Sequence, residues 1–239
     1  DKFGHEVACK TGTVRCDLSR VDVIDGSHEA CPAEPVSAEE VHEKLHQGAV
    51  DALFEEASGM GSWPAGHLRR FCEHVFAVAG DSAVDSKTRN AGIELLTRLH
   101  DRRFPTGDKR RATIVRVLED ELDRLFDTAP LFGEPANRAW RRVTWFTRDR
   151  LAAPLPGEEL LCIDSEGFPP EGDDCDAVLL KEAHRLGWKR FVVYRLRGQR
   201  FHGVGLGAAT DDVRIDLYGS NGDYTASGMD GLEIHIHGN

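Results

Sequence analysis

Three cysteines near the amino terminus, Cys9, Cys16 and Cys31, have histidines close by at His5 and His28. Thiolates and imidazoles are the ligands that zinc ions and iron–sulfur clusters take, so these cysteines are candidate metal ligands. Their spacings, with six and fourteen intervening residues, match no common zinc or cluster motif, and the chain contains no Cys-x-x-Cys pair. The spacing therefore favours ordinary thiols, with a metal site as the alternative.

A second group of candidates is the glycine-rich segment 198–208. Gly203, Gly205 and Ala208 fit the spacing of a dinucleotide-binding fingerprint, in which glycines open a helix whose amino terminus holds the pyrophosphate. Here an alternating apolar pattern at 213–217 follows almost at once, and it leaves no room for such a helix. We therefore expect these glycines to serve turns, with a nucleotide site as the alternative.

The rest of the chain offers little chemistry. His42 and His46 are four residues apart and share one face of a predicted helix, but no glutamate lies between them in the zinc-protease manner. We expect both to be solvated. No nucleophile triad, phosphate-binding loop or ferredoxin cluster motif is present in the sequence, so no catalytic residue is predicted and the chain is not expected to carry a catalytic site alone.

The composition is that of an ordinary globular protein. The chain has 239 residues, 40% hydrophobic and 30% charged, with a net charge of −11. That charge argues against nucleic acid as a general partner. No apolar run is long enough to span a membrane. Six cysteines without a pairing pattern indicate a reducing compartment, and we expect the protein to be cytoplasmic.

The amino-terminal two thirds are predicted to be helical. Residues 1–36 have no sustained period and are expected to form an irregular arm. Ser37 and Glu40 form a capping box that starts a helix, which we expect to run to Gly59. Further amphipathic helices are predicted near 64–80, 90–104, 108–126 and 136–151, the last burying Trp140 and Val143. Together they predict a bundle-like helical domain over 37–155, ending at the Pro- and Gly-rich residues 154–157.

The carboxy-terminal fifty residues change character and begin to repeat. A pattern of three alternating aliphatic residues and a glycine occurs twice, nineteen positions apart. Its members are Val213, Ile215, Leu217 and Gly219, then Leu232, Ile234, Ile236 and Gly238. The same pattern, displaced by 21, fits Val192, Tyr194, Leu196 and Gly198. A period of about 20 residues with one short strand per unit is typical of a solenoid.

The glycine-rich turns of this region resemble the GXGXG domain family, the right-handed parallel β-helix at the carboxy-terminal end of the glutamate synthase large subunit. The likeness rests on Ile163-Asp164-Ser165-Glu166-Gly167, the Gly198-Gln199-Arg200-Phe201 turn and Gly203-x-Gly205-x-Gly207. It covers about residues 160–239. We therefore expect an α+β protein, with the helical domain followed over 156–239 by a short right-handed parallel β-helix of two to three coils.

The resemblance implies a structural part of a larger assembly. In that family the β-helix is a spacer between catalytic parts, so we expect a non-catalytic subunit or fragment of a flavin and iron–sulfur oxidoreductase complex. FMN and the cluster would lie on partner subunits or domains. Two alternatives stay open. One is an enzyme that uses the nucleotide or metal candidates above. The other is a scaffold with a helical docking module and no redox role.

The resemblance and the repeat together predict an interface. An open solenoid end leaves unpaired strand groups and an uncovered apolar layer. We therefore expect Leu232, Ile234 and Ile236 to be covered by further residues, by the helical part folded back, or by a partner.

Overall fold

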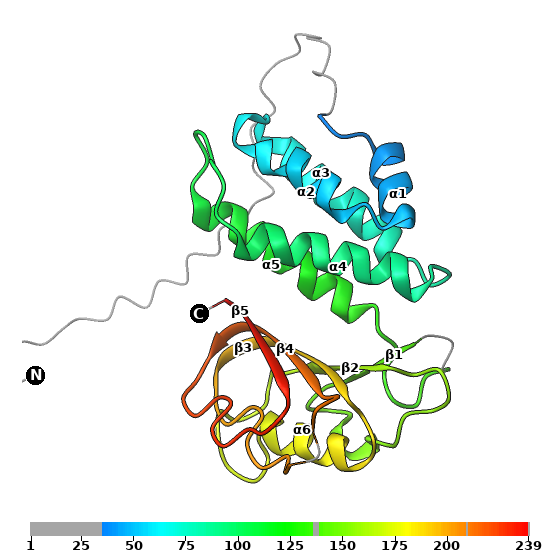
Figure 1. Cartoon of the computed structure of the whole chain (residues 1–239), viewed down its shortest axis with the longest axis vertical. Helices are drawn as coiled ribbons and strands as arrows, with labels where there is room; N and C mark the ends of the chain where they lie inside the picture. Colours follow the sequence, from blue (N-terminus) through cyan, green and yellow to red (C-terminus); the bar gives the residue numbers. More distant parts are fainter. Residues whose placement is uncertain (1–34, 136–138, 209, 239) are drawn as a thin grey trace, which may run out of the picture. The chain divides into compact units, whose positions relative to one another are not determined.

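The computed structural model describes residues 35–135, 139–208 and 210–238, and their fold is α+β. Five α-helices come first: α1 (Ala38–Gln47), α2 (Val50–Ser58), α3 (Ala65–Ala79), α4 (Ser86–Asp101) and α5 (Arg111–Asp127). Five strands and one helix follow: β1 (Trp140–Val143), β2 (Leu160–Asp164), α6 (Asp176–Arg185), β3 (Arg190–Gln199), β4 (Arg214–Asn221) and β5 (Glu233–Gly238). Figure 1 shows this order along the chain. Short 3₁₀ turns lie at Gly59–Ser62 and Arg148–Arg150.

The helix start predicted at Ser37 is confirmed, but the helix is shorter than expected. The Ser37 hydroxyl accepts a hydrogen bond from the Glu40 amide at 3.2 Å. Gly48 then adopts a left-handed φ of 74° and ends α1, and its amide donates to the Leu45 carbonyl. The single helix predicted from Ser37 to Gly59 is therefore two helices, because a glycine C-cap interrupts an otherwise continuous apolar period.

The helix predicted over 136–151 is wrong. Trp140 to Val143 form strand β1, which pairs in parallel with β2. Trp140 and Val143 are buried as expected, but Phe146 is 90% exposed, so the third member of the apolar period does not enter the core. Apolar residues three positions apart lie on one face of a helix, but they also fit a strand that buries one residue on each of its two faces. Pairing with β2 makes this segment a strand. The helical part therefore ends at Asp127, not near residue 155.

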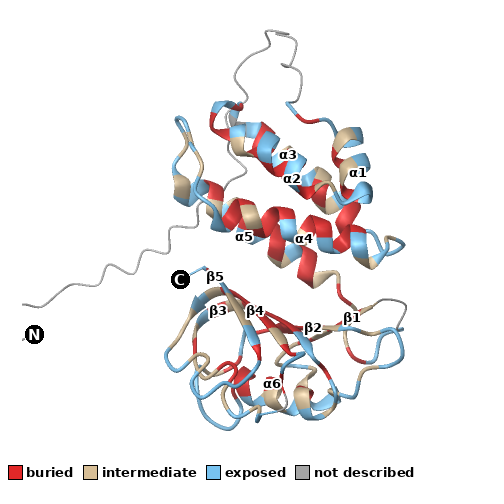
Figure 2. Ribbon diagram, in the orientation of Figure 1, coloured by how far each residue is buried: buried red, intermediate tan, exposed pale blue. Residues whose placement is uncertain are grey.

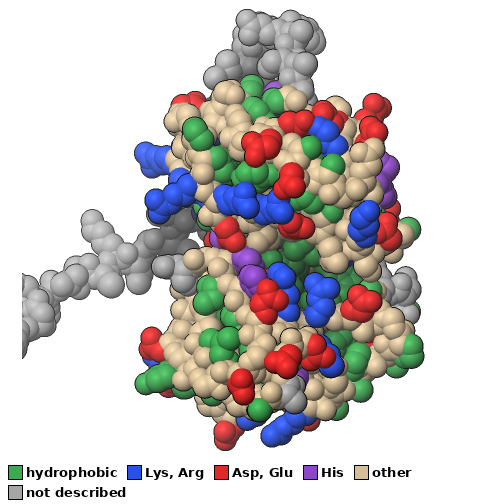
Figure 3. All heavy atoms as spheres, viewed as in Figure 1, with side chains coloured by type: hydrophobic (Ala, Val, Ile, Leu, Met, Phe, Trp, Pro, Cys, Tyr) green, Lys and Arg blue, Asp and Glu red, His purple; other side chains and the backbone are tan. Residues whose placement is uncertain are grey.

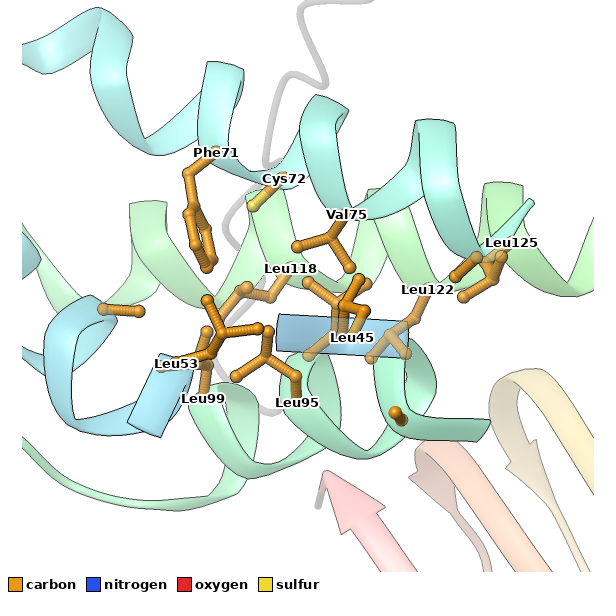
Figure 4. Close-up of a cluster of buried hydrophobic side chains, with 14 of the residues drawn as sticks. Leu45, Leu53, Phe71, Cys72, Val75, Leu95, Leu99, Leu118, Leu122 and Leu125 are labelled. Atoms are coloured by element: carbon orange, nitrogen blue, oxygen red, sulfur yellow. The ribbon is translucent and has the colours of Figure 1, made fainter. Parts of the chain in front are cut away.

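The amino-terminal helices bury a leucine-rich core. Figure 4 shows side chains from five helices directed toward one another: Leu45, Leu53, Phe71, Cys72, Val75, Leu95, Leu99, Leu118, Leu122 and Leu125. The same apolar cluster continues into one face of the sheet, through Trp140, Cys162, Tyr194 and Tyr218. The helices and the sheet therefore share one core, and residues 34–239 form one compact unit.

All five strands are parallel and lie in sequence order, β1-β2-β3-β4-β5. The face away from the helices carries Leu161, Ile163, Val193 and Leu217, which pack with Leu180 and Ala183 of α6. Burial therefore covers both faces over β2 to β4, as Figure 2 shows by colour. A parallel sheet covered on both faces requires apolar residues at consecutive positions, which explains runs such as Phe191-Val192-Val193. The sheet does not close on itself.

The nineteen-residue repeat is confirmed between the last two strands. Ile215 pairs with Ile234, and Gly219 pairs with Gly238. The displacement of 21 predicted for the preceding strand is wrong. Phe191 pairs with Ile215 and Val193 with Leu217, a displacement of 24. The two values differ by an odd number, so the predicted register assigned Val192 and Tyr194 to the wrong face of the sheet. Beyond the irregularity that follows Val193, Leu196 pairs with Gly219, a displacement of 23, and lies on the predicted face.

Gly219 is a position where the stacked strands exclude any side chain. Its φ is +111°, and an added Cβ would lie 2.6 Å from the Leu196 carbonyl oxygen of the neighbouring strand. Gly219→Ala is expected to lower the free energy of unfolding by about 2 kcal/mol, because both the backbone and the β3–β4 pairing must shift.

The matched control is Gly207→Ala, at a φ of +94° with no atom within 4 Å of the added Cβ. It carries the backbone strain alone and is expected to cost about 1 kcal/mol. Urea denaturation of both variants measures the difference. Equal losses would mean that strand contact contributes nothing at Gly219.

Candidate functional site

The glycine-rich segment predicted as a turn is a turn. Gly203, Gly205 and Gly207 have left-handed φ values of 83°, 75° and 94°. The Val204 amide donates to the Phe201 carbonyl at 3.0 Å. No helix begins in the described residues between Gly203 and β4, so the helix amino terminus that a pyrophosphate needs is not formed there. Ala208, the third member of the nucleotide candidate, is exposed.

A buried polar chain fixes this turn to the sheet. The Ser165 hydroxyl donates to the Asp176 carboxylate at 2.6 Å, and His202 Nε2 lies 3.2 Å from the same oxygen. His202 Nδ1 lies 3.1 Å from Asn221 Oδ1 at the end of β4. Ser165, Asp176 and His202 are completely buried. Because these side chains are buried and contact one another, they hold the turn against α6 and β4.

The metal candidates Cys9, Cys16 and Cys31 lie outside the described residues. The cysteines that the structure does describe, Cys72, Cys162 and Cys175, are buried and unpaired with one another. Burial raises the pKa of the Cys72 and Cys162 thiols well above the usual range, which disfavours the thiolate that metals bind. Within the described ranges, no three His, Cys, Asp or Glu side chains converge as metal ligands.

His42 and His46 are exposed, as expected, with their ring centroids 4.4 Å apart. With His74 they line a surface cavity of about 360 Å³ beside α1 and α3. His46 Nδ1 lies 3.2 Å from the Thr88 hydroxyl. The cavity has apolar walls contributed mainly by alanine and valine.

A more promising cavity lies between α4, α5 and the ends of β3, β4 and β5. We call it the cleft; its volume is about 240 Å³. Its lining residues are His100, Glu119, Asp120, Leu122, Asp123, Arg195, Leu196, Arg197, Tyr218, Gly219, Ser220 and His237. Figure 3 shows basic, acidic and histidine side chains next to one another where the helices meet the strands. Ligands of open parallel sheets commonly bind outside the carboxyl ends of the strands, which is where the last three strands end here.

An irregularity in β3 places Arg195 in the cleft. Between the pairs Val193–Leu217 and Leu196–Gly219, strand β3 has one residue more than β4. Tyr194 and Arg195 therefore both reach toward the helices, and Arg195 adopts a left-handed φ of 59°. An extra residue of this kind re-aims a side chain, and a left-handed backbone at a non-glycine residue is strained.

The Arg195 guanidinium holds three carboxylates from two elements. It donates to Asp127 at 2.5 Å, to Asp164 at 2.6 Å and to Asp123 at 3.2 Å. Burial raises the pKa of Asp123 to about 6, despite the nearby Arg195. Burial also opposes ionisation of Asp127, but hydrogen bonds from Arg195 and Tyr194 outweigh it and lower the pKa of that carboxyl. The cluster thus joins α5 to β2 and β3.

A second charged chain alternates carboxylates and imidazoles. His237 Nδ1 lies 2.7 Å from Asp101 Oδ2, and its Nε2 lies 3.2 Å from Asp216 Oδ1. His100 Nδ1 contacts the other Asp101 oxygen at 2.8 Å, and its Nε2 lies 3.3 Å from Glu119. Burial lowers the pKa of His237, but its hydrogen bonds to Asp101 and Asp216 outweigh burial and raise the pKa to about 9. The His237 imidazolium therefore links β5 to both α4 and β4.

The cleft is not predicted by the sequence. The signal available was the alternation in β5, which puts His235 and His237 on one face and the aliphatic residues on the other. Nothing in the sequence indicates that His237 meets Asp101, which lies 136 residues earlier.

Within the described ranges, no helix combines the length and apolar character that crossing a membrane requires. Comparison of the chain with protein-family models, with curated proteins and with solved structures finds no match.

Proposed function

We propose that this chain is a non-catalytic assembly subunit, or part, of a flavin and iron–sulfur oxidoreductase complex similar to glutamate synthase. In this proposal the parallel strands are the first coils of a right-handed β-helix that holds catalytic parts apart. Support comes from the GXGXG-like turns and from strands stacked in sequence order with a confirmed nineteen-residue displacement.

The observation that carries the proposal is the edge strand β5. It pairs with β4 on one side, and no described residue pairs with its other side. Ile215 and Leu217 of β4 are completely buried, whereas their partner Ile236 is 50% exposed and Ile234 is only partly buried. An edge with half-covered aliphatic rows and unpaired backbone groups is a template for one more parallel strand. Leu232, the first residue of this predicted interface, is already buried within the chain.

An aromatic stack between the turns that follow β3 and β4 indicates what the added segment resembles. The Phe201 and Tyr224 rings are nearly parallel, at 7°, with centroids 5.3 Å apart. This distance is close to the ~4.8 Å between neighbouring strands, so the stack follows the strand ladder. Tyr224 is 63% exposed. We infer a partner segment with an alternating aliphatic strand, preceded by a turn whose aromatic residue covers Tyr224.

The cofactors in this proposal belong to the partners. FMN and an iron–sulfur cluster would lie on neighbouring subunits or domains, since the described cysteines are buried and far from a cluster-ligand arrangement. The free, buried thiols of the three cysteines in the described part of the chain suit a cytoplasmic protein. The net charge of −11 favours protein partners over nucleic acid.

Capture of native partners tests the proposal. Tagged chain purified from its own cells is expected to retain a protein that carries flavin and iron, measured by absorbance and metal analysis. Ile236→Lys is expected to lower the captured amount at least about tenfold, because a charge on the edge strand would be buried unpaired in the interface.

The control is Val178→Lys on the surface of α6, where the residue is 36% exposed and far along the chain from the edge. It is expected to keep the partner. If the Ile236→Lys and Val178→Lys variants captured equal amounts of partner, β5 would not be the interface. A partner without flavin or iron would instead support a scaffold outside redox chemistry.

A further inference from the structure

Two opposite charges line the mouth of the cleft without meeting each other. Asp120 comes from α5 and Arg197 from β3, and both are exposed. Among the described residues, neither side chain makes an ion pair within 4.0 Å or a hydrogen bond; only the Arg197 backbone amide is engaged, with Gln199. Ser220 of β4, on the same lining, also has a free hydroxyl in the described part of the chain. The cleft therefore presents an acidic group and a basic group that are separated by open volume.

The charges deeper in the cleft are already paired. Arg195 is held by three aspartates, and His237 lies between Asp101 and Asp216. A ligand that carried one charge would gain contact with one wall and leave the opposite charge desolvated and unpaired. A ligand with both charges satisfies both walls.

We propose that the cleft binds a small zwitterion, a molecule with a carboxylate and an ammonium group such as a free amino acid. Arg197 and Ser220 would hold the carboxylate, and Asp120 with the half-exposed Glu119 would hold the ammonium group. The buried side chains of Leu122 and Tyr218 provide an apolar surface for the carbon skeleton. The volume of about 240 Å³ lies below the ~300–1,000 Å³ typical of drug-sized pockets and suits a molecule of this size.

The proposed ligand contacts come from α5, β3 and β4, whereas the assembly interface is the unpaired edge of β5, so separate variants test the two roles. The Arg197 guanidinium can bind a carboxylate, because its planar fork matches the two carboxylate oxygens, and it repels an ammonium group. The acidic side chains on α5 supply the complementary preference for a cation. The two preferences together select against simple anions and simple amines.

Calorimetric titration of the full chain with the common L-amino acids tests the site. For any amino acid that binds, the deaminated acid and the decarboxylated amine of the same skeleton serve as probes of each charge; for alanine these are propionate and ethylamine. Each analogue is expected to bind at least about tenfold more weakly, because a charge-assisted hydrogen bond contributes roughly 1.5–3 kcal/mol.

Two variants locate the site. Arg197→Gln and Asp120→Asn are each expected to weaken binding at least about tenfold, while Arg185→Gln on the exposed surface of α6 keeps the affinity. The absence of binding by every amino acid at millimolar concentration overturns the proposal. So does equal binding of a single-charge analogue, or unchanged affinity in both cleft variants. None of these outcomes affects capture of partners through Ile236, so the two proposals fail separately.

Discussion

Replacement of Arg195 by alanine is expected to lower the free energy of unfolding by about 3–5 kcal/mol. The guanidinium is 21% exposed and holds Asp123, Asp127 and Asp164, the last of which is 9% exposed. Removing one partner of a buried ion cluster leaves the other charges desolvated and uncompensated, which costs more than the cluster contributes when intact. Arg142 still contacts Asp127 at 2.6 Å, so part of that charge stays neutralised.

Comparison with Arg195→Gly separates the ion cluster from the backbone. Arg195 has a left-handed φ of 59°, which glycine adopts without strain. The glycine variant is therefore expected to be about 1 kcal/mol more stable than the alanine variant, although both lose the guanidinium.

Urea denaturation at neutral pH measures all three proteins, with Arg185→Ala on the exposed surface of α6 as the control. A loss no larger in Arg195→Ala than in Arg185→Ala would mean that the cluster does not hold α5 on the sheet.

The second large effect is a loss of stability at alkaline pH that depends on His237. The pKa of this imidazole is raised from 6.5 to about 9 in the folded chain. A group whose pKa is higher when folded stabilises the protein fully below its unfolded pKa and loses that contribution as pH rises through the folded value. The stabilisation is thus present at pH 6 and lost by about pH 10. A shift of this size corresponds to roughly 3 kcal/mol, as an order of magnitude.

The groups that face His237 do not cancel this effect. Asp101 and Asp216 have lowered pKa values, with Asp216 at about 2, so both remain ionised throughout the window. The Tyr218 ring stacks on the imidazole at 4.5 Å, and the pKa of its phenol is raised by burial beyond the range of the experiment. Above pH 9 the two aspartates therefore face a neutral ring.

The measurement compares the chain with its His237→Gln variant from pH 6 to pH 10. Glutamine keeps a donor but carries no charge at any pH, and titrations of groups outside the network of His100, Asp101, His237 and Asp216 cancel in the difference. The stability difference is expected to be about 3 kcal/mol at pH 6 and to fall toward zero at pH 10. A difference that stays constant with pH would show that His237 is neutral in the folded chain.

The sequence by itself determined the parts of the fold that depend on short-range pattern. The capping box at Ser37, the absence of strands between residues 64 and 126, and the turns at Gly203 to Gly207 are all confirmed. The nineteen-residue displacement between β4 and β5 is confirmed too. Each of these features depends on residues close together in the sequence, because helix periodicity, helix caps and glycine conformation are local effects.

The tertiary structure decided what depends on distant partners. Trp140 to Val143 form a strand because β2 is available to pair with them, although their spacing suits a helix equally well. The register of β3 depends on one extra residue at Arg195, and an odd shift exchanges the two faces of a strand. The cleft brings together α4, α5 and three strand ends, with the Asp101–His237 contact spanning 136 residues. Residue types at either end of such a contact carry no local period, so only the folded chain reveals that they meet.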